Sequence, residues 1–304
     1  EKPIDRRLFM HIYVRSPWHQ AIFRFSLLPL KRILTVMEKH IAVVTGASSG
    51  IGRAFAEEYA RRGYDLILTG RRTGVLDSFS AELRERWNTS VETAIFDLSD
   101  PEELELFAGN IAARRISVLV NNAGFGSPRA FSVDTYENQV RMIKVHVEAV
   151  VRLCHAVLPG MREEGEGTII NVSSLASFFP APLDALYSGT KAFLTRFSEA
   201  LQLEQSGTGI RVQALCPGFI RTEFHERLGL GKEFNRKSSG IFRWMEPQQL
   251  VRASLKALNR RRPPVIVVPG LFYRFLYLIH RLVPRSIIYR SMDGRMMNRV
   301  DGGE

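Results

Sequence analysis

Short apolar runs alternate with helical patterns along most of the chain, and this alternation constrains the fold more than any other feature. The first run is 41–45, the last is 265–268, and amphipathic segments of helix length separate most of the runs between them. Nearly continuous hydrophobic strands are typical of a parallel sheet that helices cover on both faces. We therefore predict an α/β fold: one doubly wound, seven-stranded parallel sheet with a ligand crevice at the carboxyl ends of its strands.

The individual elements follow from the same pattern. The expected strands are 41–45, 65–69, 91–96, 117–120, 168–172, 211–215 and 265–268. The expected helices are 53–62, 74–86, 101–113, 135–158 and 186–205. We assign no helix between the last two strands.

The net charge of +11 belongs to the ends of the chain. Residues 1–36, Arg260–Arg262 and residues 271–304 hold all of the excess, and residues 37–259 are neutral overall. A neutral central body does not favour nucleic acid as a partner. With 45% hydrophobic residues the chain can form a full core. We expect a single domain over 37–270, a basic N-terminal extension before it and a basic, aromatic C-terminal extension after it.

The N-terminal extension over 1–36 has no regular strand or turn pattern. Its longest uncharged apolar run, Phe25–Leu30, is too short to cross a bilayer, and no small-residue cleavage site follows it. Two interpretations remain: a basic amphipathic anchor for a membrane surface, or an appendage upstream of a natural start at Met37. We favour the second because Met37 stands just before the first expected strand.

Cys154 and Cys216 are the only cysteines. Two cysteines in a chain of this length form neither a disulfide framework nor a metal cluster, so we expect no metal. They indicate a reducing compartment. We expect a cytoplasmic protein whose termini could make peripheral contact with a membrane.

A tyrosine and a lysine four residues apart carry a chemical signal. In a helix Tyr187 and Lys191 share one face, and Ser174 precedes the tyrosine by thirteen residues. A free phenol has a pKa of about 10, and a nearby cation favours the phenolate and lowers that pKa. We therefore predict that Tyr187 is an acid/base group, that Lys191 lowers its pKa, and that Ser174 holds the substrate oxygen.

A glycine-rich turn, Thr45–Gly52, joins the first expected strand to the first expected helix. Glycines allow a tight turn and a close approach of phosphate, while the dipole and free N–H groups of the helix N-terminus attract the anion. This position favours a site for the pyrophosphate of a dinucleotide.

Five motifs stand in an order and spacing that resemble the classical short-chain dehydrogenase/reductases. They are Thr45-Gly-x-x-x-Gly-x-Gly52, Asn121-Asn-Ala-Gly124, Ser174, Tyr187-x-x-x-Lys191 and Pro217-Gly218, within a resemblance that covers residues 39–270. It implies a Rossmann-type fold, a nicotinamide cofactor and reversible hydride transfer between an alcohol and a carbonyl. It also implies a homodimer or homotetramer built on the helices near 135–158 and 186–205.

The resemblance assigns roles to single residues. Tyr187 would be the general acid/base, Lys191 would also bind the nicotinamide ribose, and Asp97 would contact the adenine. The residues expected to contact or support the cofactor are Gly46, Ser48, Ser49, Gly50, Ile51, Gly52, Arg71, Arg72, Asp97, Leu98, Asn121, Ala123, Gly124, Tyr187, Lys191, Pro217, Gly218 and Thr222.

His146 departs from the family pattern, which usually has an asparagine at this position. That asparagine completes a tetrad and holds a water in the proton relay. Histidine also donates and accepts hydrogen bonds, and it titrates near neutrality. Two interpretations stay open. His146 replaces the asparagine as a catalytic residue and makes turnover pH-sensitive, or it is a hydrogen-bonded helix histidine and the water is held otherwise.

The end of the second strand decides the choice of cofactor. An acidic residue there would bind the ribose hydroxyls of NAD, whereas arginine accommodates the 2′-phosphate of NADP. Asp65 begins this strand and is too far away, while Arg71 and Arg72 follow its end. We therefore predict NADP(H), because a guanidinium pairs with phosphate and stacks on adenine.

Aromatic residues near the expected site favour an apolar pocket. The substrate would be a ketone, an aldehyde or an acyl-chain carbonyl, because no charged residue stands out as an anchor for an anion. The segment 222–247 is where the family builds its substrate lid. The aromatic residues in question are Phe178, Phe179, Phe219, Phe224 and Trp244.

The C-terminal segment Leu271–Val283 is aromatic-rich and basic, and Pro284 ends it. It is too short to span a bilayer as one helix. It could lie at a membrane interface, cover the substrate pocket or pack against another subunit, and we favour the last two over the first.

Together these features predict an NADP-dependent oxidoreductase that acts as a carbonyl reductase on a small-molecule substrate. The alternative is an NADP(H)-binding sensor or scaffold with weak or no turnover, which His146 and the basic ends motivate. The complete set of Ser174, Tyr187 and Lys191 favours the enzyme, because a sensor needs no acid/base group beside the nicotinamide.

Overall fold

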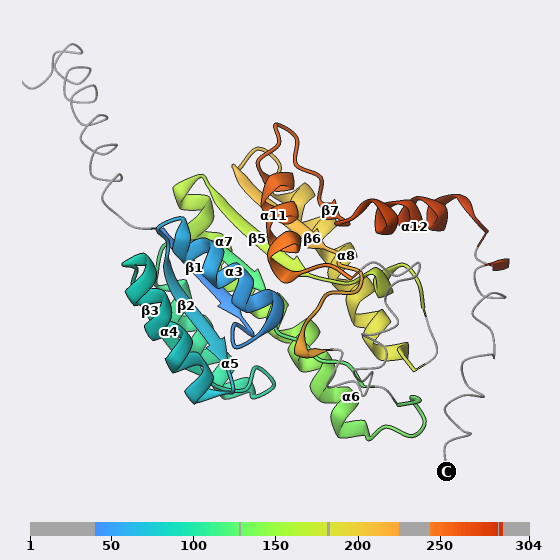
Figure 1. Ribbon diagram of the computed structural model, residues 1–304, viewed down its shortest axis with the longest axis horizontal. Coiled ribbons are helices and arrows are strands. Elements are labelled where there is room, and N and C mark those ends of the chain that lie inside the picture. The colour runs from blue at the N-terminus through green and yellow to red at the C-terminus, as the bar shows by residue number, and fades with distance from the viewer. Residues whose placement is uncertain (1–39, 128, 181–182, 225–243, 285, 288–304) are drawn as a thin grey trace, which may run out of the picture. The chain divides into compact units, whose positions relative to one another are not determined.

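Seven parallel strands form one sheet in the order β3-β2-β1-β4-β5-β6-β7 (Figure 1). The computed structural model describes residues 40–304 except for 128, 181–182, 225–243, 285 and 288–304. The predicted N-terminal extension lies outside the described residues. The strands are β1 (Ile41–Thr45), β2 (Asp65–Gly70), β3 (Val91–Ile95), β4 (Ile116–Asn121), β5 (Gly167–Val172), β6 (Ile210–Leu215) and β7 (Ile266–Val267).

Helices cover both faces of this sheet, because both faces of its strands are apolar. In β1, Val44 packs with α3, α4 and α11, whereas its neighbour Val43 packs on the other face with α5, α7 and α8. The helices are α3 (Gly50–Arg61), α4 (Thr73–Trp87), α5 (Pro101–Ala112), α6 (Tyr136–Ile143), α7 (Ala149–Glu164), α8 (Ala185–Glu204), α11 (Pro247–Leu258) and α12 (Leu271–Leu282). This is the predicted doubly wound, Rossmann-type fold, which is therefore confirmed.

Local signals set several helix ends. The side chain of Asp100 accepts hydrogen bonds from the N–H groups of Glu102 and Glu103, and Pro101 begins α5. Gly165 ends α7 in the left-handed region with φ +70. These signals are short-range, which is why the sequence predicted most boundaries to within a few residues.

Three elements differ from the prediction. The expected helix over 135–158 is α6, a π-helical turn η1 (Lys144–Glu148) and α7, which continues past Pro159. The helix α11 was not predicted, although a capping box between Glu246 and Gln249 and a proline at position 247 begin it. The last strand has only two residues.

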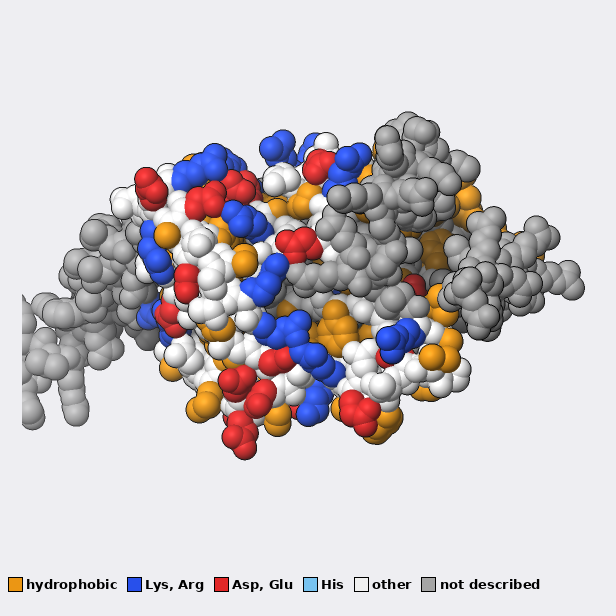
Figure 2. Space-filling view, turned by 60° about the horizontal axis from the view of Figure 1, so that its bottom comes forward, with side chains coloured by type: hydrophobic (Ala, Val, Ile, Leu, Met, Phe, Trp, Pro, Cys, Tyr) orange, Lys and Arg blue, Asp and Glu red, His pale blue; other side chains and the backbone are white. Residues whose placement is uncertain are grey.

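The sheet reverses its winding between β1 and β4, which lie side by side although β2 and β3 separate them in sequence. Ligands of doubly wound sheets bind at this switch point, outside the carboxyl ends of the strands. The loops after β1 and β4 therefore meet where a site is expected. Basic and acidic side chains are interspersed on the face of the body that Figure 2 shows.

Candidate active site

One cavity of about 380 Å³ opens at the carboxyl ends of the strands. It brings together most of the residues that the sequence singled out. Those that line it are Gly46, Ser48, Ser49, Gly50, Ile51, Arg71, Arg72, Asp97, Leu98, Ala123, Gly124, Ser174, Tyr187, Lys191, Pro217, Gly218 and Thr222. Three predicted residues, Gly52, Asn121 and His146, do not line the cavity.

The glycine turn is shaped for close approach of a ligand. Gly46 and Gly50 have φ values of +66 and +56, which side chains rarely allow. The helix α3 begins at Gly50, within this turn, so the free N–H groups of its first residues lie at the cavity wall. These residues fit the pyrophosphate of a dinucleotide.

Gly52 has a packing role instead. A Cβ atom at this position would stand 2.4 Å from the carbonyl oxygen of Gly46 and 2.5 Å from Nδ2 of Asn122. Only glycine lets α3 begin so close to the turn. Gly52 therefore supports the phosphate site from behind rather than contacting the ligand.

Asn121 does not line the cavity and supports the central strands. It is buried at the end of β4, and its Nδ2 donates to Oδ1 of Asn171 at 2.8 Å, which joins β4 to β5. The next residue, Asn122, faces the cavity instead: its Nδ2 donates to the carbonyl oxygens of Thr45 and Gly46 at 2.9 and 3.2 Å. Asn122 thus fixes the glycine turn against the loop after β4. Its place in the Asn-Asn-Ala-Gly motif was the signal that could have identified it.

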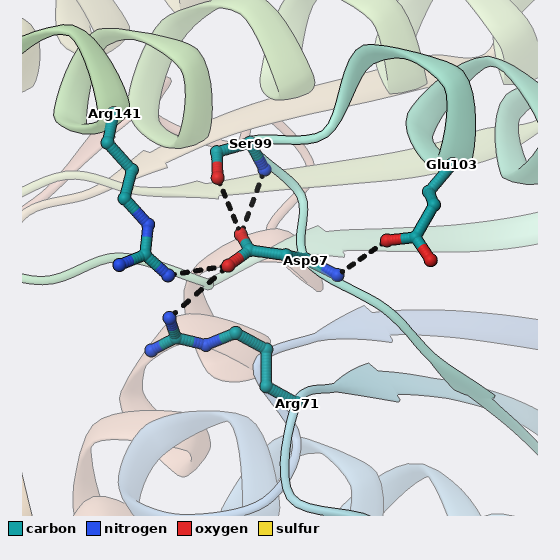
Figure 3. A network of polar contacts seen from close by, with 5 residues as sticks. All are labelled: Arg71, Asp97, Ser99, Glu103 and Arg141. Carbon is teal, nitrogen blue, oxygen red and sulfur yellow. Dashed lines mark hydrogen bonds and ion pairs between the residues drawn. The ribbon is translucent and has the colours of Figure 1, made fainter. Parts of the chain in front are cut away.

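Two arginines converge on Asp97 at one end of the cavity (Figure 3). Nη1 of Arg71 lies 3.4 Å and Nη2 of Arg141 lies 2.5 Å from Oδ2 of Asp97, while Ser99 donates to Oδ1 from its N–H and its hydroxyl. Burial alone would raise the pKa of Asp97, but the hydrogen bonds from Ser99 and the Arg141 guanidinium lower it to about 2. The carboxylate is therefore ionised at neutral pH. Arg141 was missed, since it lies on α6, far from Asp97 in sequence.

Arg72 is held beside the glycine turn. Its Nε and Nη2 donate to Oγ of Ser48 at 3.2 and 3.0 Å, and its Nη1 lies 3.0 Å from a carboxylate oxygen of Glu223. Arg71 and Arg72 both line the cavity. Two guanidinium groups next to a phosphate cradle fit a cofactor that carries an additional phosphate.

Tyr187 and Ser174 are hydrogen-bonded to each other at the other end of the cavity. Burial raises the pKa of Tyr187 to about 12, although the hydrogen bond to Ser174 acts in the opposite direction. Burial lowers the pKa of Lys191 to about 8, and its Nζ donates to the carbonyl oxygen of Val172 at 2.9 Å. The sequence predicted a lowered tyrosine pKa, but in this structure burial raises it instead.

His146 is fully buried in the π-helical turn behind this site. Its Nε2 accepts from the N–H of Phe125 at 3.0 Å, so the proton of the neutral ring is on Nδ1, which lies 3.0 Å from Oγ1 of Thr190. Thr190 in turn donates to the carbonyl oxygen of Tyr187 at 2.8 Å. Burial and the charge of Lys191 hold the pKa of His146 well below its usual value. The neutral ring thus joins the loop after β4 to the helix that carries Tyr187.

Gly124 makes room for this histidine. A Cβ atom on Gly124 would stand 2.9 Å from Nε2 of His146. Both ring nitrogens bond to protein atoms, which is the geometry of the hydrogen-bonded helix histidine. The relay hypothesis stays a prediction.

Aromatic side chains surround the catalytic end. The ring of Phe224 lies 5.9 Å from the ring of Tyr187, and Phe178 lies 4.7 Å from Tyr277 of α12. The hydroxyl of Tyr273, also on α12, accepts from the N–H of Phe219 at 3.1 Å. One face of α12 therefore packs against the loops beside the cavity, although none of its residues lines the cavity, and covering of the substrate pocket stays a prediction. Most of the predicted lid, residues 225–243, lies outside the described residues.

Two further features concern ligands and membranes. Within the described part of the chain, no group of three or more His, Cys, Asp or Glu side chains could hold a metal ion. Among the helices that the structure describes, none is long and apolar enough to cross a membrane.

A glycine turn at the switch point of a parallel sheet, in one cavity with serine, tyrosine and lysine, defines a nicotinamide-dependent oxidoreductase. The chain belongs to the short chain dehydrogenase family, whose model matches residues 40–232. This confirms the resemblance from which the site residues were carried over.

Similar proteins include reductases of different substrates. The chain is 36% identical over 186 residues to a very-long-chain 3-oxoacyl-CoA reductase of Bos taurus, a match that spans 60% of each chain. It is 38% identical over 188 residues to sulfoacetaldehyde reductase 2 of Chromohalobacter salexigens, covering 60% of this chain and 74% of that one. A short-chain dehydrogenase from Sphingobium yanoikuyae in complex with NADPH superimposes with a TM-score of 0.72 and 34% identity, covering 84% of this chain and 96% of that one.

Proposed function

We propose that the protein uses NADPH to reduce the carbonyl group of a substrate with a long apolar chain, such as a 3-oxoacyl thioester. The proposal depends above all on the hydrogen-bonded pair of Ser174 and Tyr187, which shares one cavity with the glycine turn. This arrangement places a proton donor within the same space as the proposed cofactor site.

Three groups of cavity residues would bind three parts of NADPH. The glycine turn and the N-terminus of α3 would hold the pyrophosphate, Arg71 and Arg72 the 2′-phosphate, and Lys191 the nicotinamide ribose. The cofactor then supplies a hydride for the carbonyl carbon.

The chain itself supplies the proton for the carbonyl oxygen. The Ser174 hydroxyl binds and orients that oxygen, and Tyr187 donates its proton to it. With a pKa of about 12, Tyr187 is protonated at neutral pH and is ready to act as an acid. Reduction of a carbonyl requires this protonated form of Tyr187, whereas oxidation of an alcohol requires the phenolate.

The residues at the end of β2 support NADPH over NADH as the cofactor, because Arg71 and Arg72 stand where an NAD-binding site would have an acidic residue. No acidic side chain at the end of β2 would repel a 2′-phosphate, since Gly70, Arg71 and Arg72 occupy the described residues there. The NADPH complex of the similar bacterial protein supports the same choice.

The two relatives are named for substrates of very different size and polarity. Sulfoacetaldehyde is a small anion, whereas a very-long-chain 3-oxoacyl-CoA places its keto group on a long apolar chain. The charged residues that line the described cavity, apart from Lys191, are at the Asp97 end. Lys191 donates to the carbonyl of Val172, and the ring of Phe224 lies 5.9 Å from the ring of Tyr187. This environment favours the apolar substrate.

A substrate panel with NADPH consumption as the readout tests the proposal. It contains 3-oxoacyl-CoA esters of increasing chain length, bulky ketones and sulfoacetaldehyde, each assayed with NADPH and NADH. We expect kcat/KM to rise with chain length. A preference for sulfoacetaldehyde would contradict the apolar substrate class, and NADPH binding without turnover of any compound would favour the sensor or scaffold.

A further inference from the structure

The outer face of α12 carries an apolar stripe, defined by Leu271, Phe275, Leu278 and Leu282. These side chains are 83%, 59%, 54% and 82% exposed, although they belong to a helix whose opposite face is packed on the protein. Spacings of four, three and four residues place all of them on one side of the helix. Monomeric soluble proteins rarely expose contiguous apolar patches larger than roughly a few hundred Å², and larger patches mark binding surfaces.

The inner face of the same helix is already occupied. Tyr273 is buried, and Phe272, Leu276 and Tyr277 pack with it in an apolar cluster at the β6–β7 end of the sheet (Figure 1). The exposed stripe therefore cannot turn inward without giving up this packing. Its partner must come from outside the described chain.

The charges of α12 indicate what kind of partner this is. Arg274 and Arg281 are exposed, although Nε of Arg274 donates to the carbonyl oxygen of Val268 at 3.0 Å, and the sequence LFYRFLYLIHRL contains no acidic residue. The two arginines are seven residues apart, so they lie along the same edge of the apolar stripe. An apolar stripe with cations along its edge is typical of a helix that lies in the plane of an anionic membrane interface.

The length of the helix excludes insertion across the bilayer. Twelve residues extend about 18 Å at 1.5 Å per residue, whereas the hydrocarbon core is about 30 Å thick. The helix can therefore only lie flat at the headgroup boundary.

A second copy of the chain fits this surface less well. Pairing α12 with itself would bring four arginines into one interface, and α12 offers no carboxylate to pair with them. Like charges brought together in this way oppose association. An anionic lipid surface complements the same arginines.

We propose that the outer face of α12 binds the surface of an anionic phospholipid membrane. The apolar stripe enters the boundary between headgroups and acyl chains, and Arg274 and Arg281 remain at the level of the phosphates. Membrane attachment thereby holds the helix whose inner face packs beside the cavity.

Vesicle flotation of the full chain tests this. The vesicles are phosphatidylcholine alone and phosphatidylcholine with phosphatidylglycerol, and the variants are Leu278→Glu and the matched control Leu106→Glu, at an equally apolar, 76% exposed position on α5. We expect Leu278→Glu to weaken binding to the anionic vesicles at least about tenfold, because an apolar contact is lost and a negative charge is added. Leu106→Glu should bind as the unmodified chain does.

A second variant separates the charge from the apolar contact. Arg281→Gln should weaken binding to anionic vesicles and leave binding to neutral vesicles unchanged. Equal flotation of the unmodified chain and Leu278→Glu would overturn the proposal, because binding would then come from another part of the chain. A change of oligomeric state in Leu278→Glu, measured without lipid by light scattering, would also overturn it and would assign the stripe to a second copy.

Discussion

The two ends of the cavity are built on opposite physical principles. At the Asp97 end, charged groups are partly exposed and are held by ion pairs from α6 and from the loop after β2 (Figure 3). At the Tyr187 end, burial dominates and shifts the pKa values of tyrosine and lysine toward their neutral forms. The first end recognises charge, and the second controls where a proton resides.

This difference shows why one fold can keep its cofactor site and change its chemistry. A polar end tolerates solvent because its partners are ionic and its ligand carries phosphates. A buried end needs an environment in which hydration does not compete with the reacting groups. Four experiments test the two ends separately.

Tyr187→Phe should cause the largest loss of activity, and this loss should come from the buried end of the cavity alone. Removal of the hydroxyl takes away the proton donor, so we expect kcat to fall by at least about 10³-fold. Steady-state kinetics measure kcat, and titration of NADPH fluorescence measures the Kd of the cofactor. The Kd should stay within about threefold, since a phenyl ring keeps the packing. Residual turnover above one-tenth would assign the proton to another group.

The double variant Arg71→Gln and Arg72→Gln should affect only the polar end. Loss of two charge-assisted contacts should raise the KM for NADPH by about 10–100-fold and leave the KM for NADH nearly unchanged. The matched control is Arg86→Gln, which removes an exposed ion pair with Glu57 on another part of the surface. An equal loss with both cofactors would show that these arginines do not bind the 2′-phosphate.

The pH dependence of reduction should report on the buried end. The pKa of Lys191 is about 8, so the ammonium is present below that pH and is lost above it. We expect kcat/KM to fall as the pH rises through about 8, while Tyr187 stays protonated up to about 12. Initial rates between pH 6 and 10 measure this profile. Constant kcat/KM across this range would show that the charge of Lys191 is not required.

His146→Asn should have the smallest effect on rate and a clearer effect on stability. Asparagine is too short to replace both hydrogen bonds of the buried ring, so the free energy of unfolding should fall by about 1–3 kcal/mol. Chemical denaturation measures this change. Because the pKa of His146 is held well below its usual value, the unmodified enzyme should show no inflection near pH 6.5. A large loss of kcat with unchanged stability would show that His146 has a role other than that of the family's relay asparagine.

Much of the polar end was predictable, because its residues follow strand ends in short motifs. Most of the glycine turn, Asp97 and the arginines at the end of β2 line the cavity. Arg141 was not predictable, since nothing in the sequence places α6 opposite Asp97. That contact depends on how a helix packs over the sheet.

The sequence predicted which residues form the buried end, but it did not predict the direction of their pKa shifts. Local spacing placed Tyr187 and Lys191 on one face, yet the direction of the tyrosine pKa depends on how completely the fold removes water. The role of Gly52 was also hidden, because its contact with Gly46 arises from the angle at which α3 leaves β1. Such features belong to tertiary packing.

The contact between Gly218 and Tyr273 changes how the C-terminal helix should be removed in experiments. A Cβ atom on Gly218 would meet the tyrosine ring at 2.3 Å, so the ring rests directly on the main chain of a residue that lines the cavity. A protein shortened at Gly270 would lose part of the support of its own active-site wall. Point substitutions on the solvent side of α12 are therefore the cleaner way to separate attachment from catalysis.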